Sequence, residues 1–168
     1  MEIQVRSLEP QREEQFRQDM QEAFQKGFEA VFGPSEQAVL PARDIADVRR
    51  APGAASWEAL LDGELVGGAV TVVQGEKGEL GFLYVKNGLQ GKKIGQKIWQ
   101  FLEDRYPEVR EWETVTPYFE KRNLHFYLNC CGFAAVAFYD PRHPDPRMSF
   151  QETGNGAEDC FFRFVKKR

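Results

Sequence analysis

The sequence predicts a mixed α/β domain in which a mostly antiparallel sheet of about six to seven strands carries helices on both faces. Two observations point to this class. Segments that alternate apolar and polar residues, as strands do, recur along the chain, and single segments with helical spacing stand between them. The length of 168 residues is typical of one domain, so residues 1–168 are expected to form a single domain.

A short strand and a long helix are expected at the start of the chain. Ile3 and Val5 alternate with polar residues, which predicts a strand over residues 2–8. Pro10 suits the first turn of a helix, and Gly33-Pro34 suits its end. Between them, large apolar side chains recur every four residues: Phe16, Met20, Phe24, Phe28 and Phe32. This stripe predicts an amphipathic helix that turns these side chains into the core.

The next part of the chain is expected to form a short helix and then a β-hairpin. One short helix is predicted within the proline-broken segment 34–56. Residues 57–61 and 64–73 have strand patterns, and Asp62-Gly63 between them is a hairpin turn signal. Gly67-Gly68 inside the second strand indicates a bulge or the close approach of another backbone.

Residues 78–106 combine a strand, a glycine-containing turn and a helix. Leu80, Phe82 and Tyr84 alternate with their neighbours as in a strand, and an amphipathic helix is predicted over residues 92–106. Backbone N–H groups at the start of a helix lack intrahelical partners, and the helix dipole adds about half a positive charge there. The pattern therefore predicts a site for an anionic group.

The residues around Gly91 narrow the identity of the anion. A nucleotide P-loop needs a serine or threonine after its lysine, whereas Lys93 and Ile94 follow Lys92 here. A dinucleotide fingerprint needs three glycines spaced G-x-G-x-x-G, which this turn lacks. The segment Gln90-Gly91-Lys92-Lys93-Ile94-Gly95 instead resembles the pyrophosphate loop, Q/R-x-x-G-x-G/A, of the GNAT (Gcn5-related) N-acetyltransferases, which bind acetyl-CoA. Lys93 stands where that family usually has its first glycine.

A second block resembles the same family. Residues 112–133 contain a strand, a helix that carries Tyr127, and a closing Gly132-Phe133, and this order is similar to the family's last conserved βα unit. The elements expected in this part of the chain are a strand over 112–116, a helix over 119–130, and strands over 133–139 and 158–166. The likeness covers about residues 57–140. It implies the GNAT-type fold with a splayed sheet and acetyl-CoA as co-substrate. No metal is expected, because no Cys/His set has zinc spacing.

The resemblance also implies where the coenzyme binds. The pantetheine arm would pair with the backbone of residues 83–85, near a bend that Gly81 helps to form, and the pyrophosphate would bind N–H groups of residues 90–96. The expected coenzyme-binding residues are Leu83, Tyr84, Val85, Gln90, Gly91, Lys92, Lys93, Ile94, Gly95, Gln96 and Asn123. For Lys92 and Lys93 the alternative is a solvated role at the helix start, and for Asn123 it is capping of local backbone.

Two residues are candidates for catalysis. Tyr127 lies one helical turn after Asn123, where the family commonly has a tyrosine that protonates the coenzyme thiolate. The alternative for Tyr127 is a packing aromatic. Glu79, four residues before Leu83 and expected on the same face of the strand, is the candidate base, and the alternative is an acid at the strand edge. Glu113 and Glu120 rank lower.

Composition and charge limit the partners. The net charge of −4 argues against nucleic acid as the main partner. Neither a signal peptide nor an apolar run of about 20 residues is found, so a cytoplasmic protein without membrane contact is expected. The three cysteines lack zinc spacing, and because no base can be identified beside them, a covalent cysteine intermediate is not expected.

These observations favour an N-acetyltransferase that moves an acetyl group directly from acetyl-CoA to a primary amine in a ternary complex. The alternative is a catalytically weak GNAT-fold module that binds acyl-CoA and acts as a sensor or interaction partner. The acceptor, a small molecule or a peptide, is left open, and segments 34–56 and 140–157 are expected to select it. The C-terminal strands could pair across a homodimer.

Overall fold

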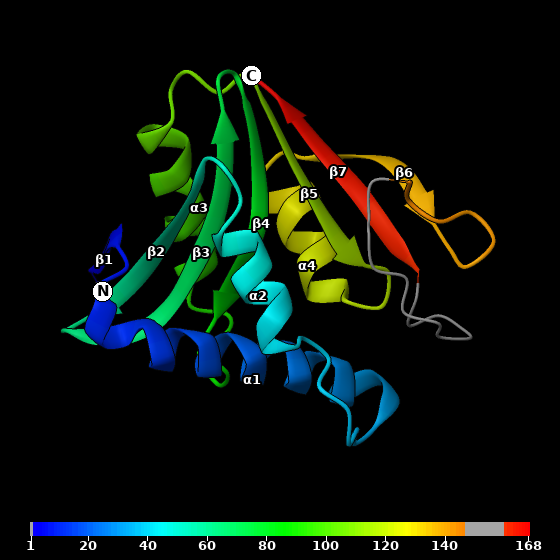
Figure 1. The fold of residues 1–168 in the computed structure, drawn as a ribbon, viewed down its shortest axis with the longest axis horizontal. Helices are drawn as coiled ribbons and strands as arrows, with labels where there is room; N and C mark the ends of the chain where they lie inside the picture. The colour runs from blue at the N-terminus through cyan, green and yellow to red at the C-terminus, as the bar shows by residue number, and fades with distance from the viewer. Residues whose placement is uncertain (1, 147–159) are drawn as a thin grey trace. The chain divides into compact units, whose positions relative to one another are not determined.

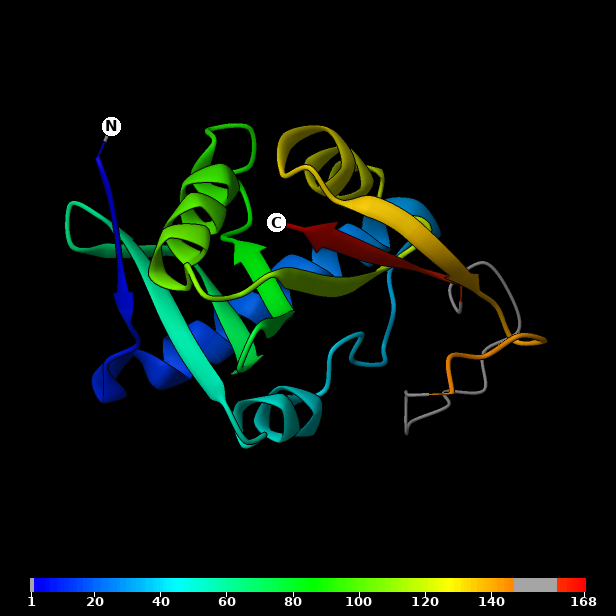
Figure 2. The ribbon, with the colours of Figure 1, turned by 90° about the horizontal axis from the view of Figure 1, so that it is seen from above.

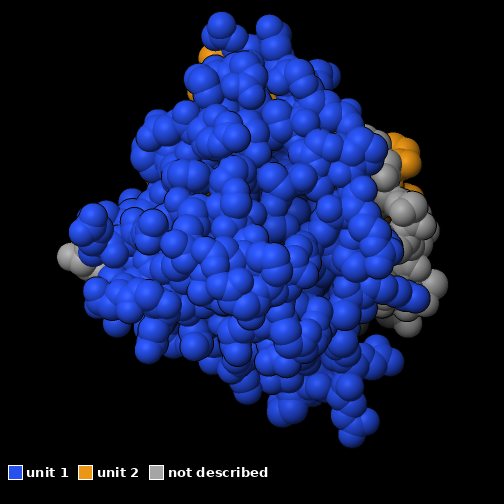
Figure 3. Space-filling view, turned by 60° about the vertical axis from the view of Figure 1, so that its left-hand side comes forward, with its two compact units in different colours: residues 1–110 blue, residues 111–168 orange. Residues whose placement is uncertain are grey.

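The structure is a computed structural model that describes residues 2–146 and 160–168 (Figures 1 and 2). The chain divides into two compact units, residues 1–110 and 111–168, which have different colours in Figure 3. The predicted mixed α/β class is confirmed, with seven strands among the described residues. The assignment of all residues to a single domain stays a prediction.

The first unit consists of four strands, three α-helices and one 3₁₀ turn. Its elements are β1 (Ile3–Ser7), η1 (Pro10–Arg12), α1 (Glu13–Phe32), α2 (Ala42–Arg49), β2 (Ala54–Leu61), β3 (Glu64–Gln74), β4 (Lys77–Val85) and α3 (Ile94–Arg105). The strands lie in the order β1-β2-β3-β4, and each neighbouring pair is antiparallel. The helices and strands predicted for this part of the chain are confirmed.

Two adjacent glycines of β3 show that helices cover both faces of these strands. A Cβ on Gly67 would lie 3.2 Å from Ile98 of α3, and a Cβ on Gly68 would lie 2.4 Å from the Phe16 ring of α1. Successive strand residues point to opposite faces, so α3 covers one face and α1 the other (Figure 2). The close approach predicted at Gly67-Gly68 is confirmed as well, because a Cβ on Gly67 would also lie 2.7 Å from the carbonyl oxygen of Tyr84.

The hairpin between β2 and β3 turns at the predicted dipeptide. Asp62 has a φ of 52° and Gly63 has a φ of 80°. Positive values at both central residues are what a two-residue hairpin turn of type I′ requires. Aspartate and glycine adopt such angles more readily than other residues, which explains why the dipeptide is a reliable signal.

The apolar stripe of α1 is only partly in the core. Phe16 and Met20 are fully buried and Phe24 packs against Phe82, but Phe32 is 40% exposed. The prediction of a uniformly buried stripe is therefore wrong at its C-terminal end. A helix of 20 residues is about 30 Å long, which exceeds the width of four strands. Neither α1 nor any other helix among the described residues has the length and apolar character to span a membrane.

β4 contains a β-bulge at Gly81. Leu80 and Phe82 pair with adjacent residues of β3, so Gly81 between them has no partner on that strand. A Cβ on Gly81 would lie 2.8 Å from the Cγ1 of Val48 in α2, which explains why glycine suits this position. The bulge lies at the glycine that was expected to help bend the strand.

The bulge changes the face on which Glu79 lies. Leu83 pairs with Ala69 and Glu79 pairs with Val72, and these two partners are three residues apart on β3. Paired residues share a face and successive residues alternate, so Glu79 and Leu83 point to opposite faces. The predicted shared face is wrong, because that prediction counted residues along a strand without a bulge.

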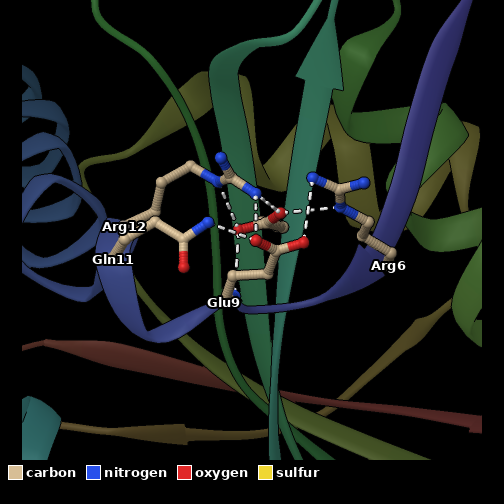
Figure 4. Close-up of polar contacts among 5 residues, drawn as sticks. Arg6, Glu9, Gln11 and Arg12 are labelled. Atoms are coloured by element: carbon tan, nitrogen blue, oxygen red, sulfur yellow. Dashed lines mark hydrogen bonds and ion pairs between the residues drawn. The ribbon is translucent and has the colours of Figure 1, made fainter.

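Glu58 of β2 is a fully buried carboxylate that joins β1 and η1 to the sheet. Arg6 donates to it at 2.9 Å, Arg12 donates at 2.8 and 2.7 Å, and the backbone N–H of Glu9 donates at 3.2 Å. Figure 4 shows Arg6 and Arg12 approaching from opposite sides. Burial alone would raise the pKa of Glu58, but these donors outweigh burial, and the pKa lies below its ordinary value.

The second unit consists of three strands, a short α-helix and a π-helical turn. Its elements are β5 (Glu111–Pro117), α4 (Lys121–His125), the π-helix η2 (Phe126–Cys130), β6 (Ala134–Tyr139) and β7 (Phe161–Lys167). The strands lie in the order β5-β7-β6, and both pairs are antiparallel. The predicted α-helix over 119–130 is wrong in its second half, which is π-helical. Residues 158–159 of the last predicted strand lie outside the described residues.

Candidate functional site

The predicted anion-binding turn links β4 to α3. Gly88 and Gly91 have φ angles of 92° and 85°, and Lys93 is also left-handed, with φ 63° and ψ 19°. Lys92, between two left-handed residues, does not have a positive φ. Turns that combine left-handed residues with residues of negative φ can point successive N–H groups to one side and bind anions. The backbone of this turn therefore fits a phosphate group.

The first turn of α3 extends this set of donors. The N–H groups of Ile94, Gly95 and Gln96 lack intrahelical acceptors, as at any helix start, and the N-cap residue Lys93 makes no capping bond with its side chain. The side chains of Lys92 and Lys93 are exposed. Unpaired N–H groups, the helix dipole and two nearby ammonium groups all favour a diphosphate at this point.

The turn has free space beside two of its glycines. A Cβ placed on Gly88 or Gly91 would meet nothing within 4 Å. The side-chain oxygen of Gln90 accepts a hydrogen bond from the N–H of Gly88 at 2.9 Å, so this glutamine holds the turn in shape. Gln90 was expected only to bind the coenzyme, and this hydrogen bond gives it a structural role as well.

Lys93 adopts a conformation that glycine adopts without steric conflict. A left-handed residue other than glycine costs about 1–2 kcal/mol, because its Cβ approaches a carbonyl oxygen. This explains why a loop of this kind usually has glycine here. The lysine presents its N–H as a glycine would, and strained backbone of this kind is concentrated at functional sites.

The residues expected to pair with the pantetheine arm lie at the end of β4. Leu83 and Val85 are half-buried, whereas Tyr84 is 3% exposed and packs edge-on against Phe16, with the ring centroids 5.5 Å apart. Burial, with a smaller contribution from Asp19, raises the pKa of the Tyr84 hydroxyl, which stays neutral. The side chain of Tyr84 therefore belongs to the core, and its backbone is the part that suits a ligand.

Tyr127, the candidate acid, lies on η2 in the second unit. It is 5% exposed and packs against Phe133 and Phe164, with ring centroids 5.6 and 5.9 Å away. Its hydroxyl forms a hydrogen bond with Thr114 of β5. Burial, followed by the nearby Cys131, raises the pKa of this hydroxyl despite that bond. The phenol is therefore fully protonated at neutral pH.

Asn123 lies on the same side of β5 as Tyr127. Its Nδ2 donates to the hydroxyl of Thr116 at 3.3 Å. Thr114 and Thr116 are both buried and two residues apart on β5, so they point to the same face. The expected one-turn relation of Asn123 to Tyr127 thus places both side chains against two threonines of one strand.

The three candidate carboxylates have different surroundings. Glu79 is exposed near the start of β4. Glu113 is engaged by Arg163 at 2.6 Å. Glu120, just before α4, has its pKa raised by burial, an effect that Arg122 partly offsets. Sequence patterns do not reveal burial. Burial gives Glu120 the raised pKa that would have supported Glu79 as the base.

A further pair was missed by the sequence analysis. The Nε2 of His125 lies 3.7 Å from the Sγ of Cys130, so the expectation that no base accompanies the cysteines is wrong. The two residues are five apart, which is not a contact spacing on an α-helix. Among the residues that the structure describes, no group of three or more histidine, cysteine or acidic side chains is placed to hold a metal ion.

Known proteins resemble this chain over most of its length. Residues 15–133 match the model of the Acetyltransferase (GNAT) family. A Bacillus subtilis (strain 168) relative, described as "Uncharacterized protein YrkN", is 40% identical over 163 residues, which cover 90% of this chain and 86% of the relative.

Solved structures of acetyltransferases share the fold. The PaiA N-acetyltransferase of Thermoplasma acidophilum, in complex with coenzyme A, has a TM-score of 0.69 at 19% identity, with 100% of both chains covered. A GNAT family acetyltransferase of Elizabethkingia anophelis with acetyl-CoA bound has a TM-score of 0.71 at 12% identity, covering 99% of this chain and 98% of the other. The ribosomal-protein-S18-alanine N-acetyltransferase of Escherichia coli has a TM-score of 0.69 at 12% identity, covering 99% and 94%.

Proposed function

Since this chain belongs to the acetyltransferase (GNAT) family, we propose that it is an N-acetyltransferase that moves an acetyl group from acetyl-CoA directly to a primary amine. The observation that carries the proposal is the left-handed Lys93 at the uncapped start of α3. A non-glycine residue held in the conformation of the family's glycine indicates that the turn is maintained for its donors.

The donor half of the proposed site lies in the first unit. N–H groups between Gln90 and Gln96 bind the pyrophosphate, and Lys92 and Lys93 add charge. The backbone of Leu83, Tyr84 and Val85 pairs with the pantetheine arm as an added strand would. Asn123 is proposed to bond the pantetheine from the second unit.

Tyr127 is proposed to stabilise the thiolate that leaves. A thiol of ordinary pKa, about 8.5, is a stronger acid than a phenol whose pKa lies above its usual value of about 10. Complete proton transfer from Tyr127 to the sulfur is therefore uphill, and a hydrogen bond donated to the developing thiolate is the better-matched role. Such a contact acts in the transition state more than in the bound state, so it affects turnover more than coenzyme affinity.

The acceptor amine must lose a proton before it attacks, since an alkylamine has a pKa near 10.4. Glu79 and Glu120 are the two candidate bases. The resemblance supports Glu79, and the raised pKa supports Glu120, because a base is most effective when its pKa approaches the working pH. Comparing the turnover of Glu79→Gln and Glu120→Gln at saturating acetyl-CoA decides between them, since the variant that lacks the base loses turnover and keeps its coenzyme affinity.

The proposal is tested by coenzyme binding and by turnover. Titration calorimetry with acetyl-CoA is expected to show binding that Gly95→Val weakens at least about tenfold, because the new side chain crowds the buried first turn of α3. Gln100→Val, at an exposed position of the same helix, is the matched control and should bind normally. Unchanged affinity in Gly95→Val would contradict the pyrophosphate assignment.

Release of free coenzyme thiol with a panel of amines tests the transfer itself. The panel includes polyamines, amino acids, amine antibiotics and lysine peptides, and also a peptide that begins with alanine, because one structural neighbour is described as acting on ribosomal-protein-S18-alanine. Turnover with one class of amine would support the proposal. Tight binding of acetyl-CoA without turnover on any amine would favour the sensor or interaction module instead.

A further inference from the structure

Three polar side chains form a cluster at the end of the second unit's helix. The Nε2 of His125 lies 3.7 Å from the Sγ of Cys130, and its Nδ1 lies 2.9 Å from the side-chain nitrogen of Asn129. All three residues are exposed to solvent. A nucleophile beside a base that a third group orients is the arrangement by which proteins activate thiols and hydroxyls.

The π-helical turn creates this cluster. On an α-helix, residues five apart are rotated by about 140° from each other, so the side chains of His125 and Cys130 would not meet. In η2 the N–H of Cys131 donates to the carbonyl oxygen of Phe126 at 2.9 Å, an i→i+5 bond that widens the turn. The extra residue brings Cys130 round to His125. π-helical turns are rare and often occur at functional sites.

The orientation of the Asn129 amide decides which part the Nε2 of His125 can play towards the sulfur of Cys130. When the amide donates to Nδ1, the ring proton is on Nε2, which can donate a hydrogen bond to the sulfur. When the amide oxygen accepts from Nδ1–H, Nε2 is free to take the proton of the thiol. In both cases Asn129 fixes the ring so that one nitrogen faces the sulfur.

Cys130 lies at the C-terminal end of the helix, and its reactivity should therefore depend on His125. The C-terminal end of a helix carries partial negative charge and does not stabilise an anion placed beside it. Lys166 of β7 also lies near this end, and its Nζ is 3.6 Å from where a Cβ on Gly132 would be. Without His125, the sulfur of Cys130 should therefore react no faster than an ordinary exposed thiol.

We propose that Cys130, with His125 and Asn129, is a nucleophilic thiol site that reacts with low-molecular-weight disulfides. The Cys130 thiolate attacks one sulfur of the disulfide R–S–S–R, a new sulfur–sulfur bond forms, the old one breaks, and R–S⁻ leaves with the electron pair. In the tautomer whose Nδ1–H donates to the Asn129 oxygen, the Nε2 of His125 takes the proton of Cys130 and can pass it to the leaving thiolate. The product is a mixed disulfide on Cys130.

Disulfide exchange suits this site better than acyl transfer does. Exchange needs an accessible thiolate but no donors for an oxyanion, and Cys130 lies on an exposed turn. Cys131 is 3% exposed, so its thiol is poorly placed to displace the attached group, and the mixed disulfide should persist until an external thiol removes it. The inference uses no part of the proposed acetyl transfer.

The test measures the rate at which the folded full chain reacts with dithiobis(nitrobenzoate), an aromatic disulfide whose released thiolate absorbs visible light. At neutral pH the first thiol to react is expected to be Cys130, identified by mass spectrometry of the labelled peptide. His125→Gln is expected to slow this phase about tenfold. His143→Gln changes the other histidine of the chain and should leave the rate within twofold of wild type.

Asn129 is tested as a positioning residue. Asn129→Ala is expected to slow the reaction about threefold, whereas Asn129→Asp, which keeps an acceptor for the ring N–H, should retain the wild-type rate. Circular dichroism of each variant confirms that the helix is intact. Equal rates for wild type and His125→Gln, or first labelling at Cys160, would overturn the proposal, and an unchanged rate in Asn129→Ala would remove Asn129 from the site.

Discussion

Glu58 and Tyr127 are both buried titratable groups, one in each unit, and their pKa values move in opposite directions. Burial by itself would raise the pKa of both side chains. For Glu58 the donors on Arg12, Arg6 and the Glu9 backbone outweigh burial, and the carboxylate stays charged. Tyr127 has a hydrogen bond to Thr114 and is otherwise packed among aromatic rings, so burial prevails and the phenol stays neutral.

The difference separates a structural role from a functional one. A carboxylate with donors on every side has no capacity left for a ligand, so the cluster in Figure 4 holds the first unit together. A neutral phenol keeps an O–H group and can still donate to a developing anion. Glu58 should therefore matter for stability and little for turnover, and Tyr127 should matter for turnover and little for stability.

Glu58→Ala provides the strongest test of the structural half of this contrast. Removing the carboxylate leaves Arg6 and Arg12 without their shared acceptor, and because solvent still reaches both arginines the cost should be about 2 kcal/mol, below that of a fully buried pair. The free energy of unfolding from urea titration at neutral pH is expected to fall by that amount. Glu14→Ala, which removes an exposed carboxylate that pairs with Arg17, is the control and should change stability little. A loss no larger than that of the control would show that the Glu58 cluster does not stabilise the unit.

Tyr127→Phe tests the functional half. It should lower turnover about 100-fold at saturating substrates while acetyl-CoA affinity stays within about twofold. Losing the bond to Thr114 should lower the free energy of unfolding by about 1 kcal/mol. Tyr118→Phe, at an exposed position of the same unit, serves as the control. If turnover were unchanged, Tyr127 would be a packing aromatic and the contrast with Glu58 would disappear.

Acid should remove the contribution of Glu58 to stability, whereas Tyr127 is already protonated at neutral pH and should not respond. A carboxylate whose pKa is lower in the folded protein than its ordinary value of 4.5 stabilises the fold above that value. This stabilisation is lost as the pH falls through the lowered pKa. In urea titrations from neutral pH to about pH 3, the difference in unfolding free energy between wild type and Glu58→Gln should therefore shrink. A difference that grows in acid would mean that the sign of the pKa shift is wrong.

Lys93 is an exposed residue whose backbone strain, unlike the contacts of Glu58, should lower stability. Lys93→Gly relieves a left-handed backbone and should raise the free energy of unfolding by about 1 kcal/mol. Lys92→Gly, next to it and without a positive φ, should lower stability by about 0.5–1 kcal/mol through the added freedom of the unfolded chain. Thermal unfolding of the two variants without ligand measures both effects. The same sign in both would contradict the strain at Lys93.

Local patterns predicted much of this protein because their physics is local. Asp62-Gly63 indicated a hairpin since few other residues adopt positive φ so easily, and the spacing around Ile98 indicated α3. The resemblance of the Gln90–Gly95 turn to an acetyl-CoA loop led to the family that the comparison of residues 15–133 then identified. In each case a short stretch of chain contained the whole signal.

Sequence patterns gave wrong predictions where a single residue changes the period of a strand or a helix. The bulge at Gly81 moved Glu79 to the face opposite Leu83, and the π-turn moved Cys130 beside His125. The shared face of Glu79 and Leu83 and the α-helix over 119–130 were predicted with a constant period, which a single unpaired or added residue breaks. The burial that raises the pKa of Glu120 was also beyond reach, since it depends on how the rest of the unit packs.

By itself, the sequence determined the order of helices and strands, the glycine-containing turn before α3 and the family, because hydrophobic period and turn chemistry act over a few neighbouring residues. Only the tertiary structure decided which charges are buried and which side chains meet. The two arginines that donate to Glu58 lie 46 and 52 positions away in the sequence, and the Tyr127 ring packs partly against Phe164. Such contacts depend on distance in space, which no spacing along the chain records.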